Sequence, residues 1–596
     1  MILDNADDVD VWFGSKSGSG SAQSTRLIDF VPMSSQGSVV FTTRNHKAAV
    51  KMAQSNVIEV AEMDEKTAVQ VLKKSLIHPD ILGDQQATSR LLNQLAYLPL
   101  AVVQAAAYIN ENKISIPEYL SLLEDTEENI IDILSEDFEE EGRYKELKNP
   151  VATTWLVSFE QIRQRDPLAA KYLSFASCLE PRNIPRSLLP PAQSKKEVVD
   201  AVGTLSAYSF ITKRPADESF DLHRLVHLAM RNWLREKALL TEWTEKAAAR
   251  LAETFPSADH KNRAIWTAYL PHARYVLSRN LLQPGIEEVI DLLGKIGLCL
   301  LADGRYNEAV EPLAEVMEAR KRVLGAEHPH TLTSIANLAG TYSNQGQWKE
   351  AEELQVQVLE ARRRVLGAEH LDTLRSMNNL AATHSDQGRW KEAEELFIHV
   401  MEATKRVLGA EHPYTLGSVG NLAVTYRKQG RWKEAEELEV QVLEATKRVL
   451  GAEHPHTLTS MASLAKTYQN QGRWKEAEEL QVQVLEARRR VLGAEHPDTF
   501  TSMTNLAQLY PDQGRLKEAE ELQVQVLEAR RRLLGAEHPH TLTCMANLAA
   551  IYRAQGQWKE AVVLMSDTVE LSYIAVGINH PATLDRQREL AVWQDK

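Results

Sequence analysis

Apolar residues in the second half of the chain recur at helical spacing, in two stripes that return together every 42 residues. In one copy the first stripe contains Leu332, Ile335 and Leu338, which are three residues apart, as on one face of an α-helix. The second stripe contains Ala351 and Val358 and is separated from the first by a short polar segment. Each copy therefore predicts two α-helices joined by a turn.

Glycines mark the breaks in this pattern, and they form two series in which neighbours are also 42 residues apart. One series follows the first stripe and contains Gly304, Gly346, Gly388, Gly430, Gly472, Gly514 and Gly556. The other follows the second stripe and contains Gly325, Gly367, Gly409, Gly451, Gly493, Gly535 and Gly577. A fixed period of this size is typical of a solenoid whose units are too small to bury their own faces. We predict an α-solenoid of seven helical hairpins and a C-terminal capping helix over residues 286–596.

The ends of the expected helices carry their own signals. Pro329 suits a first helical position, where its missing N–H costs nothing. Glu350 lies in the first turn of the second helix and Arg363 in its last turn, an arrangement that complements the helix dipole. Gly367 is expected to end this helix in a left-handed conformation.

The order of small, aromatic, glycine and acidic positions resembles the tetratricopeptide repeat (TPR), through Ala339, Tyr342, Gly346, Trp348, Glu350 and Ala351. The usual TPR period is about 34 residues. The longer form with its "LGAEHP" link is similar to the repeats of kinesin light chains and to those attached to STAND-type NTPases. This resemblance implies a superhelix that binds a protein or peptide in its concave groove.

Aligned copies differ from one another at three positions of the first helix. These variable columns are Thr333, Arg375, Gly417, Thr459, Thr501 and Thr543; Ala336, Asn378, Gly420, Ala462, Thr504 and Ala546; and Gly340, Ala382, Val424, Lys466, Gln508 and Ala550. A nearly constant polar column lies between them and contains Asn337, Asn379, Asn421, Ser463, Asn505 and Asn547. Their offsets place the columns on one helical face, which we expect to lie opposite the core stripe.

In the resembled repeats the first helices line the concave surface. We therefore expect the five asparagines to hold a peptide backbone, and variable residues such as Arg375, Lys466 and Gln508 to select its side chains. The alternative is neutral drift on a solvated face.

Composition limits the remaining possibilities. The chain has 596 residues, enough for several domains, and a net charge of −14, so it carries no nucleic-acid footprint. Its three cysteines are far apart, which favours a reducing compartment without disulfides. We expect a cytoplasmic protein without a membrane span or signal peptide.

Near the N-terminus, an apolar segment followed by Asp4, the segment "GSVVFTTRN" (37–45), the segment "VIEV" (57–60) and "LPLA" (98–101) follow one another. Each of the first three is expected to form a strand. This order resembles the NB-ARC nucleotide-binding module of STAND or NLR-type proteins, which holds ATP or ADP with Mg²⁺. By that resemblance Asp4 is the Walker B acid, Arg44 contacts the terminal phosphate and Pro99 lies against the adenine.

Residues 151–240 read as short helices, including "IPRSLL", followed by a β-hairpin with its turn at 215–218. This order predicts a winged-helix domain. The segment "FDLHRLVHLAMRNWL" resembles the motif that closes this domain in the same family, and His223 matches its phosphate-contacting histidine. Alternatives for His223 are a zinc site with His227, four residues later on a helix, and structural packing.

The histidines that precede each repeat cannot converge on one metal ion, because packed helices lie about 8–10 Å apart. We expect them to cap helices or to pack in loops. No triad, carboxylate pair or reactive cysteine setting is recognisable.

The 596 residues contain no GxxxxGK[ST] phosphate loop. In the resembled fold the strand before that loop separates the Walker B strand from the "TTR" strand, so we expect a partial α/β remnant with low nucleotide affinity. Two explanations stay open: a truncated coding sequence or a genuine loss.

We expect a partial NB-ARC module at 1–115, an acidic linker at 116–150, a winged-helix domain at 151–240, a helical bridge at 241–285 and the repeats from 286. The predicted function is a non-enzymatic interaction scaffold of STAND/NLR type. It would bind a protein or peptide, without nucleic acid, membrane or cofactor, and would form homo-oligomers only with a complete nucleotide module. The alternative is a cargo adaptor similar to kinesin light chains.

Overall fold

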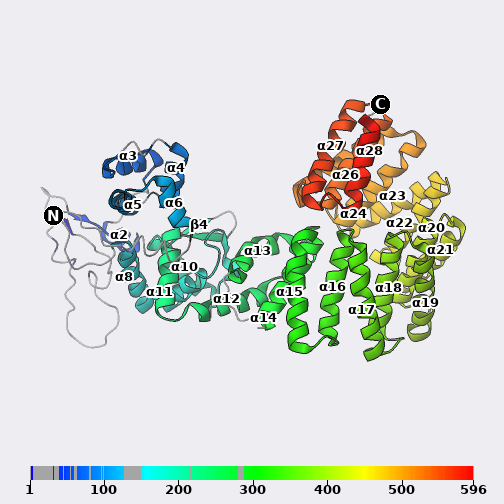
Figure 1. Ribbon diagram of the computed structural model, residues 1–596, viewed down its shortest axis with the longest axis horizontal. Helices are drawn as coiled ribbons and strands as arrows, with labels where there is room; N and C mark the ends of the chain where they lie inside the picture. Colours follow the sequence, from blue (N-terminus) through cyan, green and yellow to red (C-terminus); the bar gives the residue numbers. More distant parts are fainter. Residues whose placement is uncertain are drawn as a thin grey trace. The chain divides into compact units, whose positions relative to one another are not determined.

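The computed structural model describes residues 2–3, 12, 28, 31, 39–43, 46–53, 56–58, 63–78, 82, 84–95, 97, 99–125, 150–214, 218–278 and 287–594 (Figure 1). It divides into two units, the first comprising residues 1–255 and 264–289, the second residues 256–263 and 290–596. Each unit is described by itself.

The first unit begins with two short strands, β1 (Ile2–Leu3) and β2 (Val40–Phe41), which pair in parallel. The Thr42 N–H donates to the Leu3 carbonyl at 3.0 Å and extends this pairing. The resembled fold has a strand between these two, which we expected this chain to lack, and here the two neighbours pair directly with each other. Without a strand between them, their backbone groups satisfy each other directly. Helix α2 (His46–Ala53) follows β2, and Val57 and Ile58 lie outside any strand, contrary to our expectation for "VIEV".

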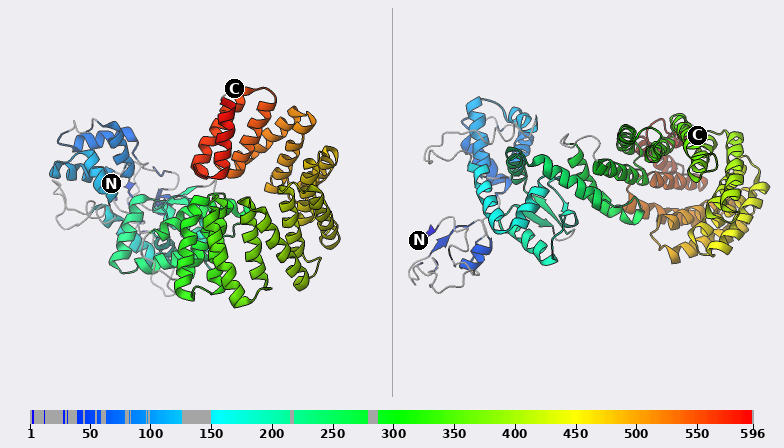
Figure 2. Two further views of the ribbon diagram at one scale, coloured as in Figure 1. Left: turned by 45° about the vertical axis from the view of Figure 1, so that its right-hand side comes forward. Right: turned by 90° about the horizontal axis from the view of Figure 1, so that it is seen from below.

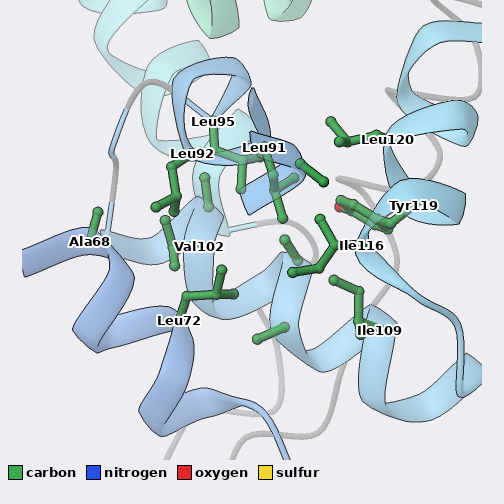
Figure 3. Close-up of a cluster of buried hydrophobic side chains, with 14 of the residues drawn as sticks. Ala68, Leu72, Leu91, Leu92, Leu95, Val102, Ile109, Ile116, Tyr119 and Leu120 are labelled. Atoms are coloured by element: carbon green, nitrogen blue, oxygen red, sulfur yellow. The ribbon is translucent and has the colours of Figure 1, made fainter. Parts of the chain in front are cut away.

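Four helices then surround one apolar core: α3 (Glu65–Ser75), α4 (Gln85–Gln94), α5 (Pro99–Asn112) and α6 (Ile116–Asp125). Figure 3 shows Leu72, Leu91 and Ile116 among the side chains that converge in it. Tyr119 on α6 is fully buried there. Residues 116–125 therefore form part of a packed core and not the start of a linker; residues 126–149 lie outside the described residues.

The next part has the winged-helix arrangement. Helices α8 (Pro150–Arg165), α9 (Pro167–Ala176), α10 (Lys195–Ala207) and α11 (Arg224–Glu236) surround a sheet of order β3-β5-β4. The hairpin strands β4 (Ile211–Arg214) and β5 (Ser219–Leu222) are antiparallel, as expected. The segment "IPRSLL" differs from our expectation: Ile184–Pro185 form β3, which pairs with β5, and a short 3₁₀ turn follows.

Helices α12 (Leu240–Thr254) and α13 (Arg263–Leu277) pack against this winged helix. Tyr269 Oη donates to Ser187 Oγ at 2.8 Å, and the buried His272 ring lies 3.0 Å from the Asn183 carbonyl. This part of the predicted bridge therefore has its own specific contacts with the winged helix.

The second unit is a solenoid of helical hairpins. Figure 2 shows its helices following a curve that brings the last hairpins over the first. The first helices are α14 (Glu287–Ala302), α16 (Pro329–Asn344), α18 (Leu371–Asp386), α20 (Pro413–Lys428), α22 (Pro455–Asn470), α24 (Pro497–Leu509) and α26 (Pro539–Ala554). The second helices are α15 (Tyr306–Leu324), α17 (Trp348–Leu366), α19 (Trp390–Leu408), α21 (Trp432–Leu450), α23 (Trp474–Val491), α25 (Leu516–Leu534) and α27 (Trp558–Ala575), and α28 (Pro581–Gln594) follows.

The expected core stripe is buried: Leu332, Ile335, Leu338 and Ala351 are each at most 3 % exposed. The glycine between the two helices adopts the left-handed conformation, with φ of 72° at Gly346. Our expectation for the other glycine series was wrong in detail. Gly367 has a positive φ of 93° but an extended ψ of 162°, so it redirects the chain into the next link instead of forming a left-handed cap.

Each recurrent histidine caps a helix, one of the two roles expected from the sequence. The His328 ring accepts through Nδ1 from the backbone N–H of His330 at 3.2 Å, with Pro329 at the first helical position. The same bond is made by His370, His412, His454, His496, His538 and His580. One donor at each helix start is thereby satisfied.

Among the residues described above, no helix combines the length and the apolar composition that crossing a bilayer requires.

Candidate protein-interaction surface of the repeats

Adjacent repeats are joined by what we call the turn clamp. It consists of a glutamate on one second helix and a glutamine and an arginine in the next turn. At one junction, Glu394 accepts from Gln429 Nε2 and Arg431 Nη1, both at 2.9 Å. Burial acts to raise the pKa of Glu394, but these hydrogen bonds outweigh burial and the pKa is lowered. The Arg431 guanidinium also lies 3.9 Å from the centre of the Tyr426 ring, a cation–π contact.

Other junctions repeat the clamp, with Glu352, Glu436 and Glu478 accepting from Gln387 and Arg389, Gln471 and Arg473, and Gln513 and Arg515. The clamp accounts for the glutamine, the arginine and one glutamate of the recurrent "QGRWKEAEEL" segment, because these three side chains join neighbouring hairpins.

A second fastening joins the end of a second helix to the next first helix. The nearly buried Arg362 donates to the Asp372 carbonyl at 3.1 Å and to Ser376 Oγ at 2.9 Å. Arg488 and Arg530 make the equivalent bonds in later repeats. The repeats between them carry Thr404 and Thr446 in this column, so this fastening holds the first helices in register at some junctions and is not a constant feature of the repeats.

The variable columns and the asparagine column form the surface that we call the first-helix face. The outermost column is exposed throughout, from Thr333 and Arg375 to Thr543. We expected the second column to lie opposite the core, but it does not. Thr504 is 7 % exposed, and Ala336 and Ala462 pack against core clusters. Neighbouring first helices approach one another along this column and shield it from solvent.

Two of the expected site residues meet across a repeat junction. Lys466 Nζ lies 3.5 Å from Gln508 Oε1 on the next first helix and donates to Gln469 Oε1 at 2.9 Å. Burial, followed by the nearby Arg427, lowers the pKa of Lys466. This amine is therefore half-buried among amide groups.

The asparagine column is partly accessible. Asn379 is exposed, and Asn337, Asn421, Asn505 and Asn547 are half-buried. Asn421 donates through Nδ2 to Asn378 Oδ1 of the preceding repeat at 3.0 Å. Arg375, in contrast, pairs with Asp372 on its own helix, with 3.3 Å between Nη1 and Oδ1. The structure therefore brings neighbouring columns together but leaves Arg375 on the exposed outer column.

A buried ion pair that we did not expect from the sequence lies beside this face. Arg427 Nη1 donates to Glu439 Oε1 at 2.9 Å and to the Ser463 carbonyl at 3.2 Å, and so joins α20, α21 and α22. Glu439 is 3 % exposed, and burial raises its pKa although Arg427 faces it. A signal was present, because aligned repeats carry Ser343 and Gln355 at these two positions.

The nucleotide-contact residues implied by the NB-ARC resemblance fall in the first unit. Asp4 and Arg44 lie outside the described residues. Pro99 is the exposed first residue of α5, and His223 precedes α11, with its N–H donating to the Phe210 carbonyl at 3.0 Å.

The zinc alternative for His223 gains no support. The His227 ring is buried, with Nε2 at 3.1 Å from the Leu179 carbonyl. Within the described ranges, no three His, Cys, Asp or Glu residues are grouped to hold a metal ion.

The repeats are similar to those of known proteins. The tetratricopeptide repeat family model matches residues 288–364, 333–397, 378–447, 416–488, 462–530 and 512–573. These hairpins are tetratricopeptide repeats. The matches overlap without a gap from 288 to 573, so each TPR hairpin and its neighbour fit the model together.

A curated relative extends the comparison. The chain is 45% identical over 340 residues to a nucleotide-binding leucine-rich repeat (NLR)-like protein of Hyaloscypha variabilis. The match covers 56% of this chain and 34% of that protein. The chain thus spans about a third of the relative's length.

The repeats of this chain are also similar to solved TPR structures. Nearly identical TPR-like repeats of a kinesin light chain from Podosopora anserina share 36% identity over 34% of this chain and 94% of theirs, with a TM-score of 0.30. A STAND protein with a tetratricopeptide repeat sensor from Pyrococcus horikoshii is 12% identical over 93% of this chain and 79% of its own, with a TM-score of 0.33.

Proposed function

We propose that this chain is the ligand-binding scaffold of a STAND/NLR-type signalling receptor, and that its TPRs hold a protein or peptide on the first-helix face. The observation that carries the proposal is that the constant and the variable columns of the repeats have different roles. Constant columns form the turn clamp, while two variable columns, those of Arg375 and of Lys466, place different side chains on a surface that solvent reaches.

The chemistry of this face suits an extended peptide. Half-buried asparagines offer paired donors and acceptors, which match the alternating N–H and C=O groups of a peptide backbone. Lys466 and Gln508 offer polar contacts between them, so repeat-specific side chains would select the residues of the ligand.

We further propose that these 596 residues neither bind nucleotide tightly nor hydrolyse it. Phosphate binding in such modules depends on the backbone amides of a glycine-rich loop at a helix N-terminus. The chain contains no such sequence, and β1 and β2 pair directly with each other.

Peptide selection tests the first proposal. A displayed library of random peptides is selected on the immobilised full chain, and the affinity of selected peptides is measured for Asn421→Ala and Lys466→Ala. Lys475→Ala, on the exposed surface of a second helix, is the matched control. We expect at least a tenfold weaker Kd for the two face variants and no change for the control. Failure to select any peptide, or peptides indifferent to both face variants, would contradict the proposal.

Calorimetric titration of the full chain with Mg·ATP and with Mg·ADP tests the second proposal. We expect no saturable heat at micromolar nucleotide. A micromolar or tighter Kd, or turnover of ATP, would show that the nucleotide proposal is wrong while leaving the peptide proposal intact.

A further inference from the structure

Three segments between helices near the start of the solenoid, at His260, Gly304 and Gly346, lie against the starts of helices near its end. These helices start at His496, His538 and His580. The His260 and His496 rings lie 4.9 Å apart, centre to centre. Asn344 accepts through its carbonyl from His580 Nε2 at 3.1 Å, although the two residues are 236 positions apart. That distance corresponds to between five and six repeats of 42 residues, so these contacts join successive turns of the superhelix.

The closest approaches occur at two turn glycines. A Cβ at Gly304 would lie 2.5 Å from Pro539 Cδ, and one at Gly346 only 2.2 Å from Pro581 Cδ. The equivalent glycines of the other repeats have open space around the same position: Gly388, Gly430, Gly472, Gly514 and Gly556. All seven have a φ between 71° and 81°. The backbone conformation therefore favours glycine in each of these seven hairpin turns. A proline ring packs against only two of the seven glycines, Gly304 and Gly346.

Arg263 makes an electrostatic contact between the same two turns of the superhelix. Its guanidinium donates to the carbonyls of Leu533 and Leu534 at 2.7 and 3.2 Å, where helix α25 ends. The last carbonyls of a helix lack partners within the helix and attract a cation. On its other side Arg263 pairs with the buried Asp303 at 2.6 Å.

We propose that these contacts form an axial clasp, defined by His260, Arg263, Gly304 and Gly346 on one superhelical turn and by the end of α25 and the helix starts at 496, 538 and 580 on the other. The clasp holds the solenoid closed through one full superhelical turn. It thereby fixes the distance between the first and the last hairpins, and with it the width of the space that the superhelix encloses.

Crosslinking in solution tests the clasp. The full chain with Asn344→Cys and Ala582→Cys is treated with a short bismaleimide, and an Asp386→Cys, Ala582→Cys protein serves as the control. Asp386 occupies the same position one repeat later, and the native cysteines Cys178, Cys299 and Cys544 are all buried. We expect an intramolecular crosslink in the first protein and little in the control. Equal crosslinking of both, or none in either, would overturn the proposal.

A matched pair of glycine variants separates the clasp from backbone strain. Gly346→Ala and Gly388→Ala impose the same strain, because φ is 72° and 78° at these sites, but only the first meets Pro581. In the Asn344→Cys, Ala582→Cys background, we expect Gly346→Ala to lower the crosslink yield several-fold more than Gly388→Ala does. Circular dichroism is used to check that both variants retain their helices. Equal crosslink yields in the two variants would show that no clasp exists.

Discussion

At the scale of single residues, Arg427 and Glu439 show how one repeat departs from the others without losing the fold. The aligned positions of an earlier repeat carry Ser343 and Gln355, which are neutral. An arginine facing a buried glutamate replaces that neutral combination. Taking Arg427 away would leave the charge of Glu439 in the interior, so the glutamate depends on the arginine. The reverse does not hold, because the aligned Arg553 is found together with Met565.

This coupling predicts the outcome of a double-mutant cycle. Arg427→Ser should destabilise the solenoid by about 3 kcal/mol, because Glu439 is left buried without its cation. Arg427→Ser with Glu439→Gln recreates the combination of the earlier repeat and should come within about 1 kcal/mol of the original stability. Urea unfolding followed by circular dichroism measures both. A double variant as unstable as Arg427→Ser alone would contradict the coupling.

The residue scale is also where sequence reasoning was least complete. The core stripe and the capping histidines could be predicted, because each depends on neighbours within one hairpin. The shielding of Thr504 could not, because it depends on how closely the next first helix approaches. Gly346 and Gly388 stand in nearly identical sequence, yet only Gly346 lies under a proline. No local pattern can distinguish them, since the difference arises from residues more than 200 positions away.

At the scale of elements, every described helix start from α16 onward that follows a recurrent histidine depends on a neutral imidazole. Nδ1 must carry a lone pair to accept the backbone N–H, and protonation removes it. His538 is the most strongly shifted example. Burial, followed by His540, Arg263 and Arg530, lowers its pKa from 6.5 to about 3. Burial also lowers the pKa of His496 and His580.

The sign of the pH dependence follows from these shifts. The unfolded chain binds a proton at His538 near pH 6.5, whereas the folded chain does so only near pH 3. The stabilisation is therefore complete above pH 6.5 and is lost as the pH falls toward 3. At pH 5 this one histidine should contribute about 2 kcal/mol less than at pH 7.

His538→Asn tests that assignment, because asparagine is a good N-cap that does not titrate. We expect the urea midpoint of the original chain to fall between pH 6.5 and 5, and that of the variant to fall less steeply. Glu394 titrates below this window, since its pKa is lowered from 4.5. Burial raises the pKa of Glu439, but this residue is present in both proteins and does not distinguish their slopes. An unchanged slope in the variant would assign the pH dependence to other groups.

Element bounds in the solenoid followed from the sequence because the same signals recur in each repeat. The first unit offered each signal only once. The strand β2 lies within the segment 37–45 where we expected one, but the direct β1–β2 pairing and the packing of α6 depend on contacts between distant segments. The buried Tyr119 gives α6 a place in the core, although the acidic residues that follow suggested a linker.

At the scale of the whole solenoid, the repeats are nearly identical, so equivalent residues of different repeats can form the clasp. Each hairpin turn presents a glycine, and each first helix from α16 onward, like α28, follows a histidine, usually with proline next. Stability in such arrays comes from nearest neighbours. Removing one complete repeat should therefore leave the hairpin junctions intact and shift the register of the superhelical contacts by 42 residues.

Deletion of residues 413–454 makes this prediction specific. The helix start at His580 and Pro581 would move one repeat closer along the chain, and it would then face Gly304 instead of Gly346. A crosslink between cysteines at positions 344 and 582 should disappear, and one between positions 302 and 582 should replace it, because Ala302 is the counterpart of Asn344. Persistence of the 344–582 crosslink would mean that these particular residues recognise each other by sequence, whereas its movement to 302 would show that the superhelical pitch alone determines which turns meet.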